Sequence, residues 1–236
     1  MTSNSEHHRK QLLSLTCTGL ACTECQHMHF VLYFHLGKGL GTNLLSPGRS
    51  TWLSGSVILL VALGACFTGY VLVFGQMSFW ALIVILNLVT VIPILDELVV
   101  MGLYGASYPV DWALGRMFVL HFLLGMMAAF SVLIHLICIH RARPSNSHVN
   151  ALSNLSDVVL KDLGILALCM VVWCTHTLHS LVHPDNFGPL SRLQTPAHIE
   201  PEAYFLFIFS VLKARSLKII GVIAIISNAC YHFSIA

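Results

Sequence analysis

Long apolar stretches separated by short polar ones dominate the pattern of hydrophobic and polar positions along this chain. A helix needs about 20 largely apolar residues to cross the hydrocarbon core of a bilayer. Stretches 54–73, 117–139 and 163–182 meet that requirement, and 219–236 is nearly long enough. The apolar run at 29–37 is typical of the end of a further helix whose beginning the pattern does not reveal. The chain is therefore predicted to be an all-α membrane protein, a transmembrane helical bundle of about four to five spans.

The apolar stretch 79–95 is predicted to form interfacial helices rather than to cross the membrane. It contains Asn87 and Pro93, and no Lys or Arg lies between 76 and 115. Lys and Arg accumulate on the side of a membrane that is not translocated. Counting this stretch as a span would place the basic loops on opposite faces, whereas leaving it out places them on one face.

The composition agrees with a membrane location. Of the 236 residues, 56% are hydrophobic and 9% are charged, and the mean hydropathy is +0.80. Soluble domains carry about 25% charged residues, so this chain lacks the surface charge to remain in water. The formal net charge of +2 is too small to indicate nucleic acid as a partner.

Eight cysteines are scattered along the chain. Cys17, Cys22 and Cys25 superficially resemble a cluster of metal ligands, but the second half of a zinc pattern is missing. Metal binding there is accordingly the less favoured interpretation. The cysteines in or beside apolar stretches are expected to act as small hydrophobic side chains; they are Cys66, Cys138, Cys169, Cys174 and Cys230.

Two histidines lie fourteen residues apart inside the apolar stretch 117–139. Fourteen residues of helix rise about 21 Å and fall about 40° short of four whole turns, so His121 and His135 project from one face at two depths. Gly55 and Gly69 are also fourteen apart, and a glycine gives clearance where a bulky group approaches the backbone. Imidazoles and clearances at the same two depths fit two haems. The alternative is that the histidines are packing residues and the small residues promote helix contacts.

Four motifs follow in an order that resembles one family. They are LYFHLGKGL (32–40), GYVLVFGQMSFW (69–80), VDWALGRMFVLHF (110–122) and HPDNFGPLSRLQTPAHIEPEAYFLF (183–207). In sequence and spacing they resemble mitochondrial cytochrome b, the haem-carrying core of ubiquinol–cytochrome c reductase. The resemblance implies the middle portion of the cytochrome b fold.

The resemblance also implies the haem ligands. His35 and His135 would be the axial pair of the high-potential haem, and His121 would serve the low-potential haem. The family's fourth ligand falls on Ala21, so the second of the two b-type haems has one recognisable ligand. The residues expected near the haems are Gly55, Gly69, Lys38 and Arg116, the last two as partners of the propionates.

Quinol chemistry is implied at two places. Glu202 in PEAY would accept a proton from ubiquinol, with Tyr204 beside it. On the opposite face, His140 and Asp162 match the family's proton-donating pair at the site of quinone reduction. The residues expected to line the quinol pocket are Tyr70, Phe74 and Trp80. The alternatives are a loop carboxylate for Glu202, an interfacial anchor for His140 and a helix N-terminal charge for Asp162.

The family pattern divides the chain and also breaks in places. Residues 1–29 are unassigned, 30–143 form a haem-binding part, and 144–236 form a C-terminal part with the PEAY loop. Ala203 replaces the family's tryptophan and Ala81 a glycine, and the family's first helix is not recognisable. The chain is therefore interpreted as a shortened, divergent cytochrome b, a fragment of one, or a remnant that does not turn over.

The function implied is electron transfer from ubiquinol through b-type haems across the membrane, coupled to proton translocation in the respiratory chain. The chain would be a redox subunit that is not active alone. Its partners would be a Rieske iron–sulfur protein, a cytochrome c1-type subunit and membrane lipid, in a dimeric complex. The location would be the mitochondrial inner membrane, with the bacterial plasma membrane as alternative. Another haem-bearing transmembrane electron shuttle and a non-redox helical bundle remain as competing functions.

Overall fold

The structure is a computed structural model that describes part of the chain. The described residues are 24–41, 49–90, 101–103, 105, 111–141, 160, 163–164, 167–168, 183–187, 190–199, 201–213 and 218–234. Contacts divide the chain into two units, Met1–Glu24 with Arg143–Val182, and Cys25–Ala142 with His183–Ala236. The first unit is described at a few isolated positions, so the fold below is that of the second. Most of the predicted span 163–182 lies outside the described residues.

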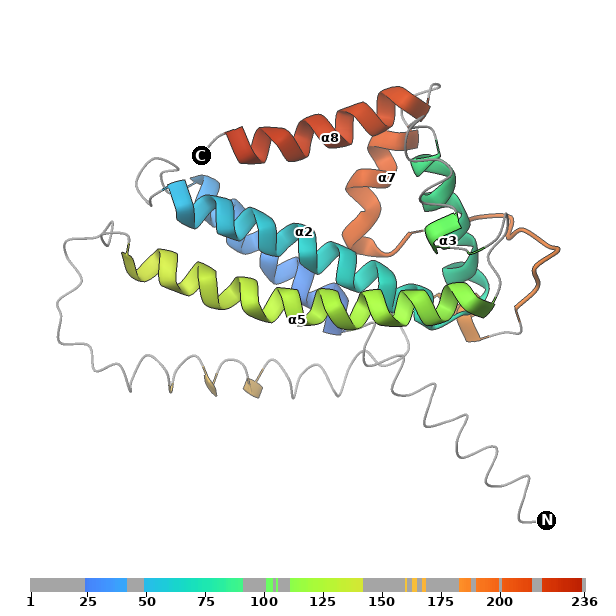
Figure 1. The fold of residues 1–236 in the computed structure, drawn as a ribbon, viewed down its shortest axis with the longest axis horizontal. Coiled ribbons are helices and arrows are strands. Elements are labelled where there is room, and N and C mark those ends of the chain that lie inside the picture. The colour runs from blue at the N-terminus through green and yellow to red at the C-terminus, as the bar shows by residue number, and fades with distance from the viewer. Residues whose placement is uncertain are drawn as a thin grey trace, which may run out of the picture. The chain divides into compact units, whose positions relative to one another are not determined.

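All regular structure in the described residues is helical. Residues 24–41 form a helix, shown in dark blue in Figure 1. The other elements, in chain order, are α2 (Arg49–Leu72), α3 (Gln76–Val89), α5 (Asp111–Arg141), η1 (Pro184–Phe187), η2 (Ala203–Phe205), α7 (Leu206–Lys213) and α8 (Lys218–Ser234).

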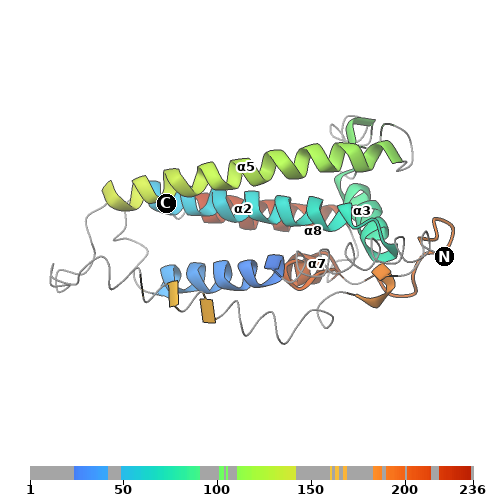
Figure 2. The same cartoon turned by 90° about the horizontal axis from the view of Figure 1, so that it is seen from below.

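Helices α2 and α5 run side by side in opposite directions (Figure 1). Both α2 and the part of α5 at 113–141 are long and apolar enough to cross a bilayer. Gly64 of α2 allows close approach, because a Cβ there would lie 3.4 Å from the Leu124 side chain of α5. Figure 2 shows helix 24–41 on the other side of α2 from α5.

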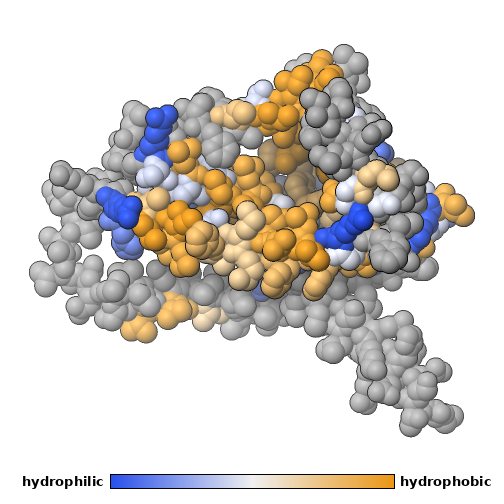
Figure 3. Space-filling view, viewed as in Figure 1, coloured by the Kyte–Doolittle hydropathy of each residue, from blue (hydrophilic) through white to orange (hydrophobic). Residues whose placement is uncertain are grey.

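The outer face of α5 is covered with large apolar side chains. The hydrophobic surface that they form is the broad orange band over α5 in Figure 3. Exposed apolar side chains on a long helix are expected where the solvent is lipid rather than water. The exposed residues include Phe118, Phe122, Met126, Phe130, Leu133 and Ile137.

Helix α3 follows α2 after a sharp turn. Phe74 has a positive φ of 51°, and the N–H of Phe74 donates to the carbonyl of Val71, which ends α2. The helix itself has 14 residues, too few for a span of about 20, which agrees with the interfacial position expected for 79–95, of which the structure describes 79–90. A buried cluster joins α2, α3 and α5; its members are Val71, Leu82, Leu86, Ala113 and Met117.

Candidate functional site

A cavity of about 300 Å³ lies among helix 24–41, α2 and α5. His35 lines it from helix 24–41, His135 from α5, and Gly55 from α2. Lys38 and Trp52 also line the cavity. The structure therefore brings together two of the histidines and one of the glycines that the sequence singled out. Imidazoles from two different helices face one space.

The imidazole of His135 is oriented by Ser54. The hydroxyl of Ser54 donates to the carbonyl oxygen of Thr51 at 3.0 Å and lies 2.8 Å from Nδ1 of His135. A hydroxyl has one proton to donate, so its oxygen accepts from the Nδ1–H of His135. This hydrogen bond leaves Nε2 with a free lone pair, which is the arrangement that orients a histidine as a metal ligand.

Gly55 gives the imidazole of His135 room beside α2 at this cavity. A Cβ at Gly55 would lie 3.2 Å from Cε1 of His135, so a side chain there would crowd the imidazole. His35 is exposed to the cavity rather than packed against neighbours, unlike a histidine that serves packing. Lys38 supplies a cation at the cavity wall, where acidic groups of a cofactor would otherwise be buried unpaired. The residues present fit a haem held by two imidazoles.

His121 is placed differently. Nδ1 lies 2.8 Å from the carbonyl oxygen of Ala65 and 3.3 Å from the hydroxyl of Thr68. A Cβ at Gly69 would lie 2.8 Å from Cε1 of His121, so this ring lies directly on the backbone of α2. The second histidine and the second glycine therefore meet at the same level, as the fourteen-residue spacing requires.

The sequence supplies no recognisable second imidazole for a haem at His121. Position 21, the expected partner position, is alanine in the sequence and lies outside the described residues. His27 and His29 lie eight and six residues before His35, about 12 Å and 9 Å of helix. Both are therefore too close to His35 along the helix to occupy the partner position, which lies fourteen residues before it. The role of His121 as a haem ligand stays a prediction.

Arg116 and Lys38 were expected to pair with propionates. Lys38 lines the His35–His135 cavity. The guanidinium of Arg116 instead donates to the carbonyl oxygens of Met101 at 2.8 Å and Gly102 at 2.6 Å. A propionate would compete with these two hydrogen bonds, so Arg116 as its partner stays a prediction.

A small apolar cavity of about 60 Å³ lies where α2, α3 and α7 meet. Tyr70 and Glu202 both line it, so the structure brings these two predicted residues together. Ala81, which stands where the family has glycine, also lines it, so its methyl group lies at the cavity wall. Phe74 packs edge-on against Phe79 outside this cavity. The other expected residue, Trp80, does not line it either.

Glu202 is 9% exposed and accepts a hydrogen bond from the side-chain amide of Gln26 in helix 24–41. Burial raises the pKa of Glu202 to about 7, and the hydrogen bond from Gln26 opposes that rise. A carboxyl group with a pKa near neutrality can both accept and release a proton at physiological pH. Glu202 is therefore buried rather than solvated, and its role as the proton acceptor of a quinol stays a prediction.

Helix 24–41 also contacts Tyr204 through two of its side chains. The phenol of Tyr33 donates to the carbonyl oxygen of Tyr204 at 2.9 Å. The imidazole of His29 stacks on the ring of Tyr204, with the ring centroids 4.8 Å apart. Sequence reasoning missed Gln26 and Tyr33, because their partners lie 176 and 171 residues away and no local pattern links them.

Replacing Gln26 with alanine is expected to raise the pKa of Glu202 further, because the hydrogen bond that stabilises the carboxylate is lost. The smaller deprotonated fraction would lower, several-fold at pH 7, the rate of the quinol oxidation that the resemblance implies. The measurement is the pH dependence of quinol oxidation, whose rise should move to higher pH. Glu24→Ala, at an exposed position in the same helix, is the control; an unchanged profile in Gln26→Ala would contradict the assignment.

Asn186 in η1 fixes the junction of α2 and α3. Its Oδ1 accepts from the backbone N–H of Met77 at 3.0 Å and of Ser78 at 3.1 Å. Its Nδ2 donates to the phenol oxygen of Tyr70 at 3.2 Å. Sequence reasoning missed Asn186, although it lies in the quoted motif 183–207. Through these bonds η1 holds Tyr70 at the wall of the small apolar cavity.

Replacing Gly75 with alanine is expected to destabilise this junction. A Cβ there would lie 2.7 Å from the backbone of Asn186, and overpacking of this kind costs about 1–3 kcal/mol. The measurement is thermal unfolding in detergent, with a lower midpoint expected. Gly115→Ala in α5 is the matched control, because nothing in the described part of the chain lies within 4 Å of its Cβ. Equal losses in the two variants would contradict this account.

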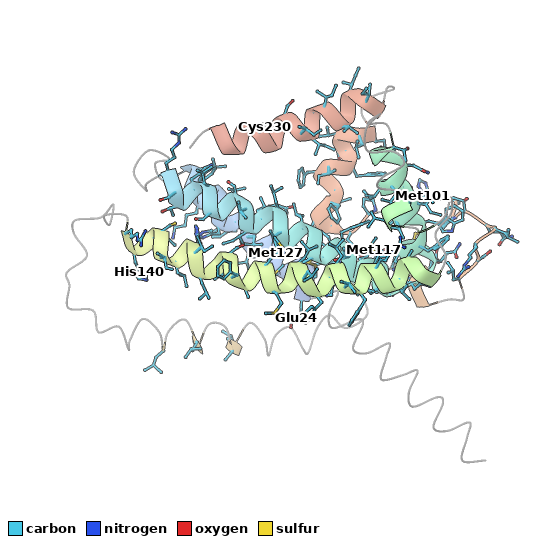
Figure 4. The ribbon with its side chains drawn as sticks, viewed as in Figure 1. Glu24, Met101, Met117, Met127, His140 and Cys230 are labelled. Carbon is cyan, nitrogen blue, oxygen red and sulfur yellow. A yellow bond between two sulfur atoms is a disulfide. The ribbon has the colours of Figure 1, made fainter. Side chains whose placement is uncertain are left out.

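The structure describes one member of the predicted proton-donating pair. His140 lies in the last turn of α5, where Figure 4 labels it, and its side chain is exposed. Asp162 lies outside the described residues, so the pair stays a prediction.

Cys25 and Cys66 form a disulfide, with their Cα atoms 6.2 Å apart. This bond corrects the expectation that Cys66 acts as a small hydrophobic side chain. The two residues are 41 positions apart, and they meet because helix 24–41 packs against α2. Cys17 and Cys22 lie outside the described residues.

Two family models match the chain. The one described as Cytochrome b/b6/petB matches residues 20–143, more than half of the chain, and the one described as Cytochrome b(C-terminal)/b6/petD matches residues 189–236. Among solved structures, a chain titled "Hyperthermophilic respiratory Complex III" matches with a TM-score of 0.80 and 24% identity. The match covers 93% of this chain and 62% of that one, so the present chain spans less than two thirds of the matched chain. The predicted all-helical membrane fold is confirmed.

Proposed function

Because the chain belongs to the cytochrome b family, we propose that it is the haem-bearing redox subunit of a ubiquinol–cytochrome c reductase. The resemblance read from its four motifs is confirmed by the two family models, and the chain is a shortened cytochrome b. The observation that carries the proposal is the cavity lined by His35 and His135. It supports a b-type haem that these two imidazoles would hold.

His35 and His135 would hold this haem, which would supply one-electron carriage when bound. Ser54 keeps the Nδ1–H of His135 engaged, so that Nε2 remains the ligand atom. Lys38 would compensate the charge of a propionate. No step is assigned to a second haem, because the position expected to supply its second ligand is Ala21.

At the small apolar cavity, Glu202 would accept a proton from ubiquinol. A quinol ring needs flat apolar walls and few polar anchors, and this cavity offers Phe67, Tyr70 and Phe205 as aromatic walls with Glu202 as the acid group. The hydrogen bond from Gln26 keeps the carboxyl group at the cavity until it releases the proton. Helix 24–41 thus contributes to both the haem ligand set and the orientation of the acid.

The remaining elements of the proposal come from the family. On the opposite face, His140 and Asp162 would deliver protons to quinone. Electron transfer would be coupled to proton translocation, with a Rieske iron–sulfur protein and a cytochrome c1-type subunit as partners in a dimeric complex. The location proposed is the mitochondrial inner membrane, with the bacterial plasma membrane as alternative.

A reduced-minus-oxidised absorption spectrum of the purified chain tests the proposal directly. We expect a b-type component from the His35–His135 cavity. A second b-type component would mean that His121 finds a ligand elsewhere in the assembly, and a single component would mean that the His121 position carries no haem. The absence of any b-type component would overturn the proposal and leave a non-redox helical bundle.

A further inference from the structure

A cluster outside the two sites described above holds two cysteines and a histidine. The sulfur atoms of Cys25 and Cys66 and a ring nitrogen of His29 lie within 4.8 Å of one another. Helix 24–41 supplies Cys25 and His29 four residues apart, on one helix face, and α2 supplies Cys66. We propose that, when the Cys25–Cys66 disulfide is reduced, these three side chains form a binding site for Zn²⁺ or a similar soft divalent cation.

His29 is held as a metal-binding histidine is held. Its Nδ1 lies 3.0 Å from the carbonyl oxygen of Cys25. A carbonyl oxygen only accepts, so Nδ1 carries the ring proton and Nε2 carries the lone pair. Metal-ligating histidines commonly donate their other N–H to a backbone carbonyl in this way.

The burial of His29 is a second, independent observation. The side chain is 0% exposed, and Nε2 has no hydrogen-bond partner among the described residues. A buried nitrogen without a partner costs about 1–3 kcal/mol, and the stacking of the ring on Tyr204 does not supply a donor to the lone pair. A bound cation would satisfy it.

The ligand set suits zinc in charge and size. Two thiolates and one neutral imidazole balance the charge of Zn²⁺, so the loaded site adds no net charge to an apolar region. On a tetrahedral Zn²⁺, two sulfurs lie about 3.8 Å apart and a sulfur and a nitrogen about 3.6 Å apart. The three ligand atoms already lie within 4.8 Å of one another, which is near those separations. Water takes the fourth position.

Metal binding and the disulfide are alternative states of the same cluster. A phosphine breaks the sulfur–sulfur bond by giving up two electrons, and water supplies the oxygen of the phosphine oxide and the protons of two thiols. Zn²⁺ then displaces both thiol protons and accepts an electron pair from each thiolate. In both states a covalent or coordinate link joins helix 24–41 to α2. The residues that follow the two cysteines in the chain are Gln26, which donates a hydrogen bond to Glu202, and Phe67, which lines the small apolar cavity.

The test uses the full chain purified in detergent, reduced with a phosphine and titrated with Co²⁺ as the spectroscopic probe. We expect one Co²⁺ per chain, with a thiolate-to-metal charge-transfer band in the near ultraviolet. The oxidised chain should show no such band. Cys25→Ser and Cys66→Ser should lose this band. Losing a residue that only hydrogen-bonds a metal ligand lowers metal affinity roughly 10- to 100-fold, and losing a ligand itself should lower the affinity for Zn²⁺ by more than that.

His29→Gln separates metal binding from folding. This variant should still form the Cys25–Cys66 disulfide in air, which shows that the two helices pack correctly, but should lose high-affinity Co²⁺ binding. Cys138→Ser and Cys230→Ser, at the two free cysteines of the described residues, are matched controls that should retain the band. Figure 4 labels Cys230 on α8. A reduced chain without the band, or a band that survives in Cys25→Ser and Cys66→Ser, would overturn the proposal.

Discussion

Replacing His135 with alanine is expected to abolish the b-type component assigned to the cavity between helix 24–41, α2 and α5. An axial ligand cannot be replaced by the neighbouring side chains, because Gly55 and Ser54 offer no imidazole at that level. The measurement is the reduced-minus-oxidised spectrum of the purified chain. Free imidazole added to the variant should restore part of the signal, since the substitution opens space next to Gly55.

His140→Ala is the matched control for this experiment. It removes a histidine from the same helix, five residues further on and exposed, and should leave the spectrum unchanged. His35→Ala should reproduce the loss seen with His135→Ala, because one haem needs both ligands. Survival of the b-type component in either His35→Ala or His135→Ala would refute the ligand assignment and return these histidines to a packing role.

The level at which residues of α2 and α5 meet was predictable from the sequence alone. The helical rise fixes how far apart two residues on one helix lie, whatever the rest of the protein does. Two glycines and two histidines have equal spacing on these antiparallel helices. Once one glycine lies beside one histidine, the other glycine and the other histidine therefore lie side by side as well. The structure places Gly55 against His135 and Gly69 against His121.

Contacts between distant segments were not predictable in the same way. The Cys25–Cys66 disulfide depends on how helix 24–41 rotates about its axis against α2, and cysteine spacing carries no information on that rotation. The hydrogen bonds of Arg116 to Met101 and Gly102 show a related limit. Depth along a helix was read from the sequence, but the identity of the nearest acceptor depends on a loop whose path the sequence does not specify.

Glu202 shows both what the sequence could predict about the site and what it could not. The PEAY motif pointed to Glu202, and Tyr70 was expected near it from a separate motif; the structure places both at one cavity. The burial that raises the pKa of Glu202 and the partner that opposes this rise come from tertiary packing. Gln26 precedes Glu202 by 176 residues, and no periodicity or motif joins them.

Replacing Glu202 with glutamine is expected to slow quinol oxidation by a factor of about 10² to 10⁴, the range typical of losing a general base. Glutamine keeps the shape of the side chain but cannot take the proton. The deprotonated fraction of Glu202 grows as pH rises through its pKa of about 7. The rate of the unmodified protein should therefore rise across that pH range, and the rate of Glu202→Gln should be low and independent of pH there. The measurement is steady-state quinol oxidation by the assembled complex.

Two controls decide whether Glu202 acts on the proton or only supports the structure. Glu24→Gln makes the same chemical change at an exposed position and should leave both rate and pH dependence intact. The reduced-minus-oxidised spectrum of Glu202→Gln should equal that of the unmodified chain, because Glu202 does not line the His35–His135 cavity. A lost spectrum would assign Glu202 a structural role, and a retained rise in rate through pH 7 would assign the proton transfer to another group. A slow, pH-independent rate with an intact spectrum would place the first proton of quinol oxidation on this carboxylate, held at the cavity by the amide of Gln26.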